Sequence, residues 1–104
     1  MDHICIDEYV LDVLLPDLVG HDRAPTAFLV YLALWAALYR SEERRVAISL
    51  NQLSENTGLS KSGVQKAIRV LKRRGLVAVR KSSATGVPEY ELIRHWVRRR
   101  AKKA

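Results

Sequence analysis

Residues 49–74 constrain the fold of this 104-residue chain more than any other segment. Ser49 opens a capping box, in which its hydroxyl accepts a hydrogen bond from the backbone of Gln52 while the Gln52 side chain reaches back to Ser49. This pattern predicts a helix that runs to about Thr57. Gly58 then ends the helix, because glycine adopts the positive φ that a sharp turn requires. We therefore expect the chain to turn abruptly from one helix into another.

The second of these helices is strongly two-sided. Leu59 fills the corner, and Ser60 is an N-cap residue from which a helix extends over residues 60–74. Its apolar residues are spaced three and four apart and form one stripe, which we expect to face the core: Val64, Ala67, Ile68 and Leu71. The residues off this stripe are polar or basic: Lys61, Ser62, Gln65, Lys66, Arg69, Lys72 and Arg73.

Such a polar side has the chemistry to lie in the major groove of DNA. Arg and Lys donate to guanine, Gln pairs with adenine, and Ser or the helix N-terminus binds phosphate. The predicted contacts to double-stranded DNA on this helix are Ser60, Lys61, Ser62, Gln65, Lys66, Arg69, Lys72 and Arg73.

The distribution of charge agrees with this prediction. Residues 1–56 carry four basic and nine acidic groups, a net charge of −5, whereas residues 57–104 carry 14 basic and two acidic groups, a net charge of +12. Because neutralising phosphates releases counterions, a half-chain of this charge is typical of nucleic-acid-binding proteins. The plainer alternative is a basic face that only keeps the protein in solution.

Two further helices are expected in residues 1–45. Apolar spacing from about Asp7 predicts the first helix, which is interrupted near Pro16 and closed by Gly20. The second helix follows a turn at residues 22–26 and ends at Arg40 and Ser41. The second helix is apolar nearly all round, with Phe28, Leu29, Leu32, Trp35, Ala36 and Tyr39 on one side and Val30, Tyr31, Leu34 and Leu38 on others. It must be covered on several sides, either by this chain or by a second one. So small a domain has little material for wrapping a helix, which favours a homodimer.

The remaining segments predict short strands. Alternation at residues 46–50 suits a brief strand, and two β-prone runs, Leu76–Lys81 and Val87–Ile93, flank turn residues at Ser82–Gly86. Pro88 is tolerated there only near a sheet edge. These runs predict a β-hairpin.

Residues 46–93 together resemble a known family. The run from Ile48 to Leu92 is similar to the winged helix-turn-helix core of MarR-like and GntR-like transcriptional regulators and of some replication-initiation proteins. The family's pattern of a helical Leu, a turn Gly, Leu-Ser and a recognition helix falls on Leu53, Gly58, Leu59, Ser60, Val64, Ala67, Ile68 and Leu71. Its closing Gly-Leu-Val falls on residues 75–77.

The resemblance implies a mainly α fold with a small β-hairpin wing (α+β), and a regulator that binds specific DNA sequences. Residues 1–93 would form one domain, with leading helices in 1–45 and the helix-turn-helix and wing in 46–93. In the family the wing, here residues 80–86, reaches the phosphate backbone or the minor groove, which implies that Arg80 and Lys81, clustered with Ser82 and Ser83, are positioning contacts. The alternative is a solvated hairpin whose charges guard an edge strand.

The C-terminal tail, residues 94–104, holds six basic side chains in eleven residues. We expect Trp96 and Val97 to pack back on the domain, and like-charge repulsion beyond them to favour disorder when no polyanion is present. The tail is either a phosphate-binding arm or a solubilising extension.

The sequence gives little support to a metal-binding protein, an enzyme or a membrane protein. The group His3, Cys5 and Asp7 is an incomplete metal set and is interpreted as structural, and no catalytic motif is present, so we expect no enzyme activity, cofactor or metal. The longest apolar run, residues 27–39, is shorter than the roughly 20 residues of a membrane span. A single cysteine and the absence of a signal-peptide pattern indicate a cytoplasmic protein, and the expected DNA binding would make it nucleoid-associated.

Three functions remain open. The first is a dimeric, sequence-specific transcriptional regulator. The second is a plasmid or phage replication or partition protein that uses the same domain on repeated sites. The third is a winged-helix module that docks on an acidic protein, against which stands the Lys, Gln and Arg composition of the recognition helix. The sequence does not identify a small-molecule effector.

Overall fold

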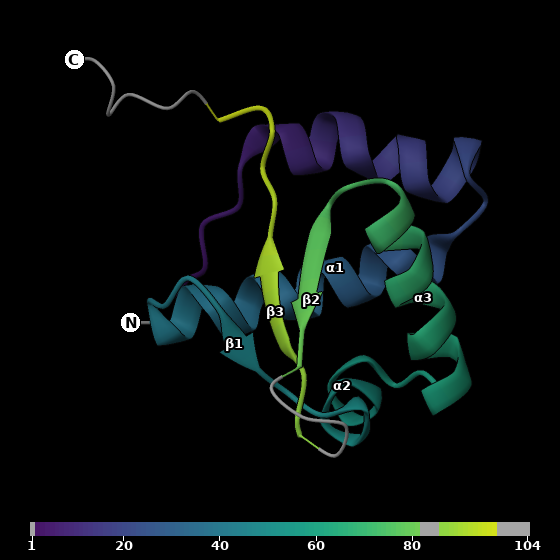
Figure 1. The fold of residues 1–104 in the computed structure, drawn as a ribbon. Helices are drawn as coiled ribbons and strands as arrows, with labels where there is room; N and C mark the ends of the chain where they lie inside the picture. Colours follow the sequence, from purple (N-terminus) through teal and green to yellow (C-terminus); the bar gives the residue numbers. More distant parts are fainter. Residues whose placement is uncertain (1, 82–85, 98–104) are drawn as a thin grey trace.

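The computed structural model describes residues 2–81 and 86–97, which form helices packed against one side of a small antiparallel sheet (Figure 1). The helical elements are η1 (Val10–Leu14), η2 (Asp17–His21), α1 (Pro25–Ser41), α2 (Leu50–Thr57) and α3 (Lys61–Arg73), and the strands are β1 (Val46–Ala47), β2 (Val77–Arg80) and β3 (Glu89–Leu92). The predicted α+β winged helix-turn-helix fold is confirmed. Within the described residues, no helix combines the length and the apolar character needed to cross a membrane.

The N-terminal helix consists of η1 and η2, whose hydrogen bonds span five residues rather than four. Pro16 separates the two parts, but its φ of −66° and ψ of −29° are helical, so the helix continues past it. The predicted interruption near Pro16 therefore does not break the helix, which ends at His21 rather than at Gly20. Its buried residues recur every fourth position: Val10, Leu14 and Leu18.

Helix α1 is the centre of the core. It contacts η2, α2, α3 and the strands β1 and β3, so elements of its own chain cover it on several sides. Its buried residues are Ala27, Phe28, Val30, Tyr31, Leu34 and Trp35. Leu29 is 44% and Tyr39 43% exposed, so the residues expected to share one side of this helix are not all buried. The reason is that an apolar helix has no polar side from which its orientation could be inferred.

The predicted helix-turn-helix is present. Ser49 accepts from the backbone N–H of Gln52 at 3.1 Å, although the Gln52 side chain donates to Asn56 at 2.9 Å instead of reaching back to Ser49. The capping box is therefore half formed. Gly58 has a φ of +81°, and Ser60 caps α3 by accepting from the N–H of Gly63 at 3.1 Å. All four residues of the predicted apolar stripe are buried: Val64, Ala67, Ile68 and Leu71.

The sheet has the strand order β1-β3-β2, with both pairs antiparallel. The hairpin strands are shorter than the predicted runs, and the brief strand expected near residue 46 is β1, which pairs Val46 with Tyr90 of β3. Tyr90 is 2% exposed and also pairs with Val79 of β2, so it anchors the sheet on the core. Most of the predicted turn, residues 82–85, lies outside the described residues.

We predict that Gly58→Ala lowers the free energy of unfolding by about 1–2 kcal/mol, because an L-residue is strained at positive φ. No atom lies within 4 Å of the added Cβ, so the cost comes from the backbone alone. Gly20→Ala is the matched control: it also meets no atom within 4 Å, but it lies in helix η2 and should gain roughly 0.5–1 kcal/mol. Urea unfolding of both variants checks the prediction, and equal shifts would contradict it.

Candidate nucleic-acid interface

Helix α3 presents one continuous polar side to solvent. Each residue predicted to contact DNA there is exposed: Ser60, Lys61, Ser62, Gln65, Lys66, Arg69, Lys72 and Arg73. Within the described part of the chain, no ion pair involves the five basic residues of this set. Because no described residue neutralises them, their positive charge is available to a polyanion.

The N-terminus of α3 is already organised by its cap. The Ser60 hydroxyl accepts from Gly63 and lies 3.2 Å from the Ser62 hydroxyl. A Cβ at position 63 would lie only 3.3 Å from this hydroxyl oxygen, so glycine leaves room for the cap. Ser60 is thus engaged in the helix itself, and the backbone N–H groups of Lys61 and Ser62 in the first turn are left to bind an anion.

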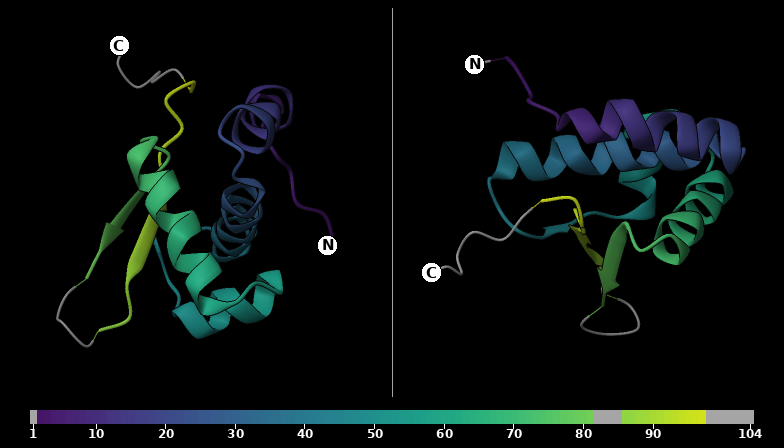
Figure 2. Two further views of the ribbon diagram at one scale, coloured as in Figure 1. Left: turned by 90° about the vertical axis from the view of Figure 1, so that its right-hand side faces the viewer. Right: turned by 90° about the horizontal axis from the view of Figure 1, so that it is seen from above.

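The wing strand follows α3 closely. β2 contacts α3, and Arg80 at its end is exposed and lies in register with Glu89 of β3. Lys81 is exposed as well, whereas Ser82 and Ser83 lie outside the described residues. Figure 2 shows the β2–β3 hairpin and α3 on one side of the molecule and the N-terminal helix on the other.

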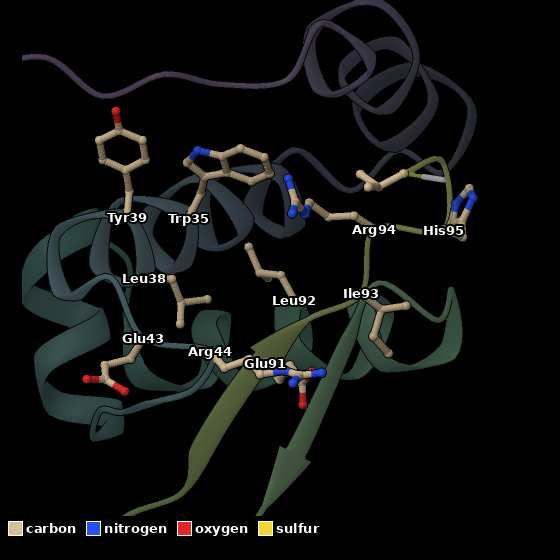
Figure 3. A pocket seen from close by; sticks show the side chains of 11 residues that line it. Trp35, Leu38, Tyr39, Glu43, Arg44, Glu91, Leu92, Ile93, Arg94 and His95 are labelled. Carbon is tan, nitrogen blue, oxygen red and sulfur yellow. The ribbon is translucent and has the colours of Figure 1, made fainter. Parts of the chain in front are cut away.

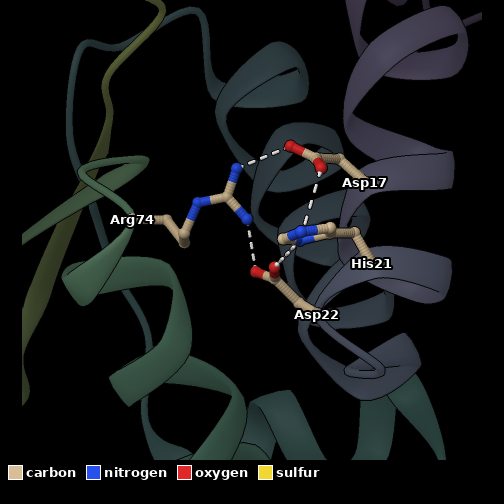
Figure 4. A network of polar contacts seen from close by, with 4 residues as sticks. All are labelled: Asp17, His21, Asp22 and Arg74. Carbon is tan, nitrogen blue, oxygen red and sulfur yellow. Dashed lines mark hydrogen bonds and ion pairs between the residues drawn. The ribbon is translucent and has the colours of Figure 1, made fainter.

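Arg74 has a role that the sequence pattern does not reveal. The pattern predicts it within the recognition helix, yet its guanidinium turns to the N-terminal helix, where one nitrogen donates to Asp17 at 2.6 Å and the other donates to Asp22 (Figure 4). We call these three residues the Arg74 clamp. The sequence signal is weak, since Asp17 and Asp22 lie more than 50 residues from Arg74.

The clamp shifts the pKa of its members. Hydrogen bonds from His21 and then from Arg74 hold the pKa of Asp22 below its ordinary value of 3.8, and hydrogen bonds to Asp17 and Asp22 raise the pKa of Arg74.

Asp17, His21 and Asp22 form the one group of potential metal ligands in the described chain, with ligand atoms within 4.8 Å of one another. Arg74 bonds one carboxylate oxygen of each aspartate, so a cation would compete with it.

We predict that protonation of Asp22 in acid lowers the stability of the folded protein. Since its pKa is lower in the folded state, its contribution to stability is present above pH 3.8 and is lost as the pH falls through the folded pKa. Asp22→Asn should remove this part of the acid dependence and lower stability at neutral pH. Thermal unfolding of both proteins between about pH 7 and pH 2 checks this. Parallel curves for the two proteins over this range would contradict it.

The first residues of the tail are anchored on the N-terminal segment, as predicted for Trp96. Its indole N–H donates to Asp7 at 2.9 Å and its ring stacks on Tyr9 at 4.4 Å. Arg94 donates to the same carboxylate at 3.1 Å, whereas Val97 is 44% exposed and contributes less than expected. Asp7 therefore binds this segment, and His3, Cys5 and Asp7 do not form a metal-binding group in the described chain.

A cavity of about 690 Å³ lies between α1, β3 and this anchored segment (Figure 3). Trp35, Leu38 and Leu92 contribute apolar surface to it. Two of its charged groups, Arg44 and Glu91, pair with each other at 3.5 Å, and Arg94 is paired with Asp7. The cavity has the size of a small-molecule site, but its paired charges do not define a ligand.

Comparison with known proteins agrees with this geometry. The MarR family profile matches residues 32–86, more than half of the chain, and the match spans α2, α3 and β2. No curated protein and no solved structure matches the chain.

Proposed function

We propose, because this chain belongs to the MarR family of winged helix-turn-helix proteins, that it is a non-enzymatic transcriptional regulator that binds specific sequences of double-stranded DNA as a homodimer. The observation that carries this proposal is the outer side of α3. It holds five basic residues without ion-pair partners in the described chain, while the opposite side of the same helix is buried. We place its site of action on DNA in the cytoplasm.

The proposed contacts divide into two kinds. Gln65 and Arg69 lie mid-helix on the exposed side of α3 and are assigned to base readout in the major groove. The other exposed residues are assigned to phosphates, which fix the register of the protein: Ser60, Lys61, Ser62, Lys66, Lys72 and Arg73. Arg80 and Lys81 of the wing are assigned to the backbone or the minor groove.

A second copy of the chain would fit the outer side of the N-terminal helix. Leu11, Leu15 and Val19 recur every fourth residue next to the buried stripe, and they are 48%, 36% and 38% exposed. Glu8 at one end and Arg23 beyond the other are exposed and have no ion-pair partner in the described chain. An antiparallel pair of these helices would bury the apolar residues and bring opposite charges together. The recognition helices would lie away from this contact (Figure 2).

We predict that Leu15→Glu produces a monomer, because it places charge at the centre of the proposed contact. Val13→Glu is the matched control: Val13 is similarly exposed, at 39%, but two positions away it points to another side of the helix. Light scattering coupled to size exclusion should give twice the monomer mass for the wild type and the control. A dimeric Leu15→Glu variant would exclude this surface as the interface.

The test of the proposed function is selection of bound duplexes from a random pool at near-physiological salt. Enrichment of an inverted repeat would support a dimeric regulator. Enrichment of direct repeats would favour the replication or partition role. If no sequence is enriched and binding vanishes as salt rises, only backbone contacts remain and the regulator proposal is wrong.

A further inference from the structure

We infer that Arg74 is a positioning residue for DNA recognition: the Arg74 clamp sets the position of α3 on the N-terminal helix and so controls DNA affinity without touching DNA. This inference rests on the proposed DNA-binding function.

The clamp joins three parts of the fold at one side chain. Arg74 is the C-cap residue of α3, Asp17 begins η2, and Asp22 lies in the turn between η2 and α1. One terminal nitrogen of Arg74 bonds each carboxylate, as the dashed lines in Figure 4 show. Movement of α3 relative to the N-terminal helix would therefore lengthen at least one of the two bonds.

The geometry makes this contact more specific than an ordinary surface ion pair. The side chains of Arg74, Asp17 and Asp22 are 31%, 34% and 18% exposed, so water reaches them only in part. A planar guanidinium directs two donors at fixed angles, which a lysine ammonium does not reproduce. The other contacts of α3 within the core are made by apolar residues, which hold the helix against α1 without such directional bonds.

The position of the clamp matters because it lies where the recognition helix meets the wing. Gly75, with a φ of +71°, follows Arg74, and β2 begins two residues later and ends at Arg80. Base readout tolerates displacements of only about 0.5 Å. A shift at Arg74 would move both the C-terminal turn of α3 and the base of the wing.

Neutralising the two aspartates of the Arg74 clamp distinguishes a positioning role of Arg74 from direct contact between Arg74 and DNA. Asp17→Asn with Asp22→Asn removes two negative charges and releases a guanidinium, so simple electrostatics predicts tighter DNA binding. Positioning predicts the reverse, a loss of affinity for the selected duplex of roughly 2- to 30-fold. Glu42→Gln with Glu43→Gln is the matched control, because it removes the same charge from two exposed residues that make no ion pair in the described chain.

The experiment measures affinity for the selected duplex and for a scrambled duplex, at a temperature at which circular dichroism shows every variant folded. We expect the aspartate double variant and Arg74→Met to lose specific affinity alike, and their combination to lose no more than Arg74→Met alone. Amide exchange at residues 72–76 should quicken in both. Unchanged or tighter specific binding by the aspartate variant, as in the control, would overturn the inference. Failure of the wild type to select any duplex would instead refute the proposed function.

Discussion

Replacing Leu71 by alanine is expected to lower the free energy of unfolding by about 2–5 kcal/mol. Leu71 is fully buried on the inner side of α3, and the contact of α3 with α1 is the main helix–helix contact of the fold. Truncation removes apolar burial and leaves a cavity that a close-packed core fills only in part. A domain of this size has about 5–15 kcal/mol of stability in all, so the loss is a large share of it.

Urea unfolding followed by circular dichroism measures the effect, and Lys72→Ala provides the control. Lys72 is the exposed neighbour of Leu71 on the same helix, and its truncation should change stability by no more than about 0.5 kcal/mol. If the two substitutions lower the free energy of unfolding equally, α3 does not pack on α1 through the buried stripe. The prediction tests the fold independently of DNA.

Replacing Arg69 by alanine is expected to cost about 1–3 kcal/mol of binding free energy at one base pair of the selected site and to relax the base preference there. Arg69 is exposed in the middle of α3 and has no ion-pair partner in the described chain. Arg80→Ala, at the end of β2, should instead weaken binding to all duplexes alike, because phosphate contacts carry no sequence information.

Binding to the selected duplex and to single-base variants of it distinguishes these outcomes. Arg40→Ala is the charge-matched control, since Arg40 is exposed on α1 and has no proposed role in binding. The slope of affinity against salt shows, for each variant, how many DNA phosphates the protein neutralises. Equal losses of affinity on every duplex for both Arg69→Ala and Arg80→Ala would contradict the assignment of Arg69 to base readout.

Much of the local structure was predictable because it depends on neighbouring residues. The Ser49 and Ser60 caps, the positive φ of Gly58 and the stripe of Val64 to Leu71 are set by hydrogen bonds and spacings within a few positions. The same rules placed the exposed basic side of α3 opposite the stripe. The candidate interface was thus predicted residue by residue, and its contacts with DNA stay a prediction.

Other features were not decided by the local pattern. Gln52 bonds Asn56 because a second partner was within reach, and the local pattern did not show which one it would choose. The sequence did not show which side of α1 is buried, because Leu29 and Leu34 look alike in it. Only packing against η2, α2 and α3 decides which of them is buried.

Short-range hydrogen bonding and periodicity encode the two capped helices, the turn between them and the separation of acidic from basic halves, so these features follow from the sequence. The folded arrangement was needed to show that Arg74 binds Asp17 and Asp22, that Asp7 holds Arg94 and Trp96, and that β1 completes the sheet. These contacts join residues that lie far apart in the chain. A charged side chain has many possible partners in a sequence, and only the tertiary fold brings one of them within hydrogen-bonding distance.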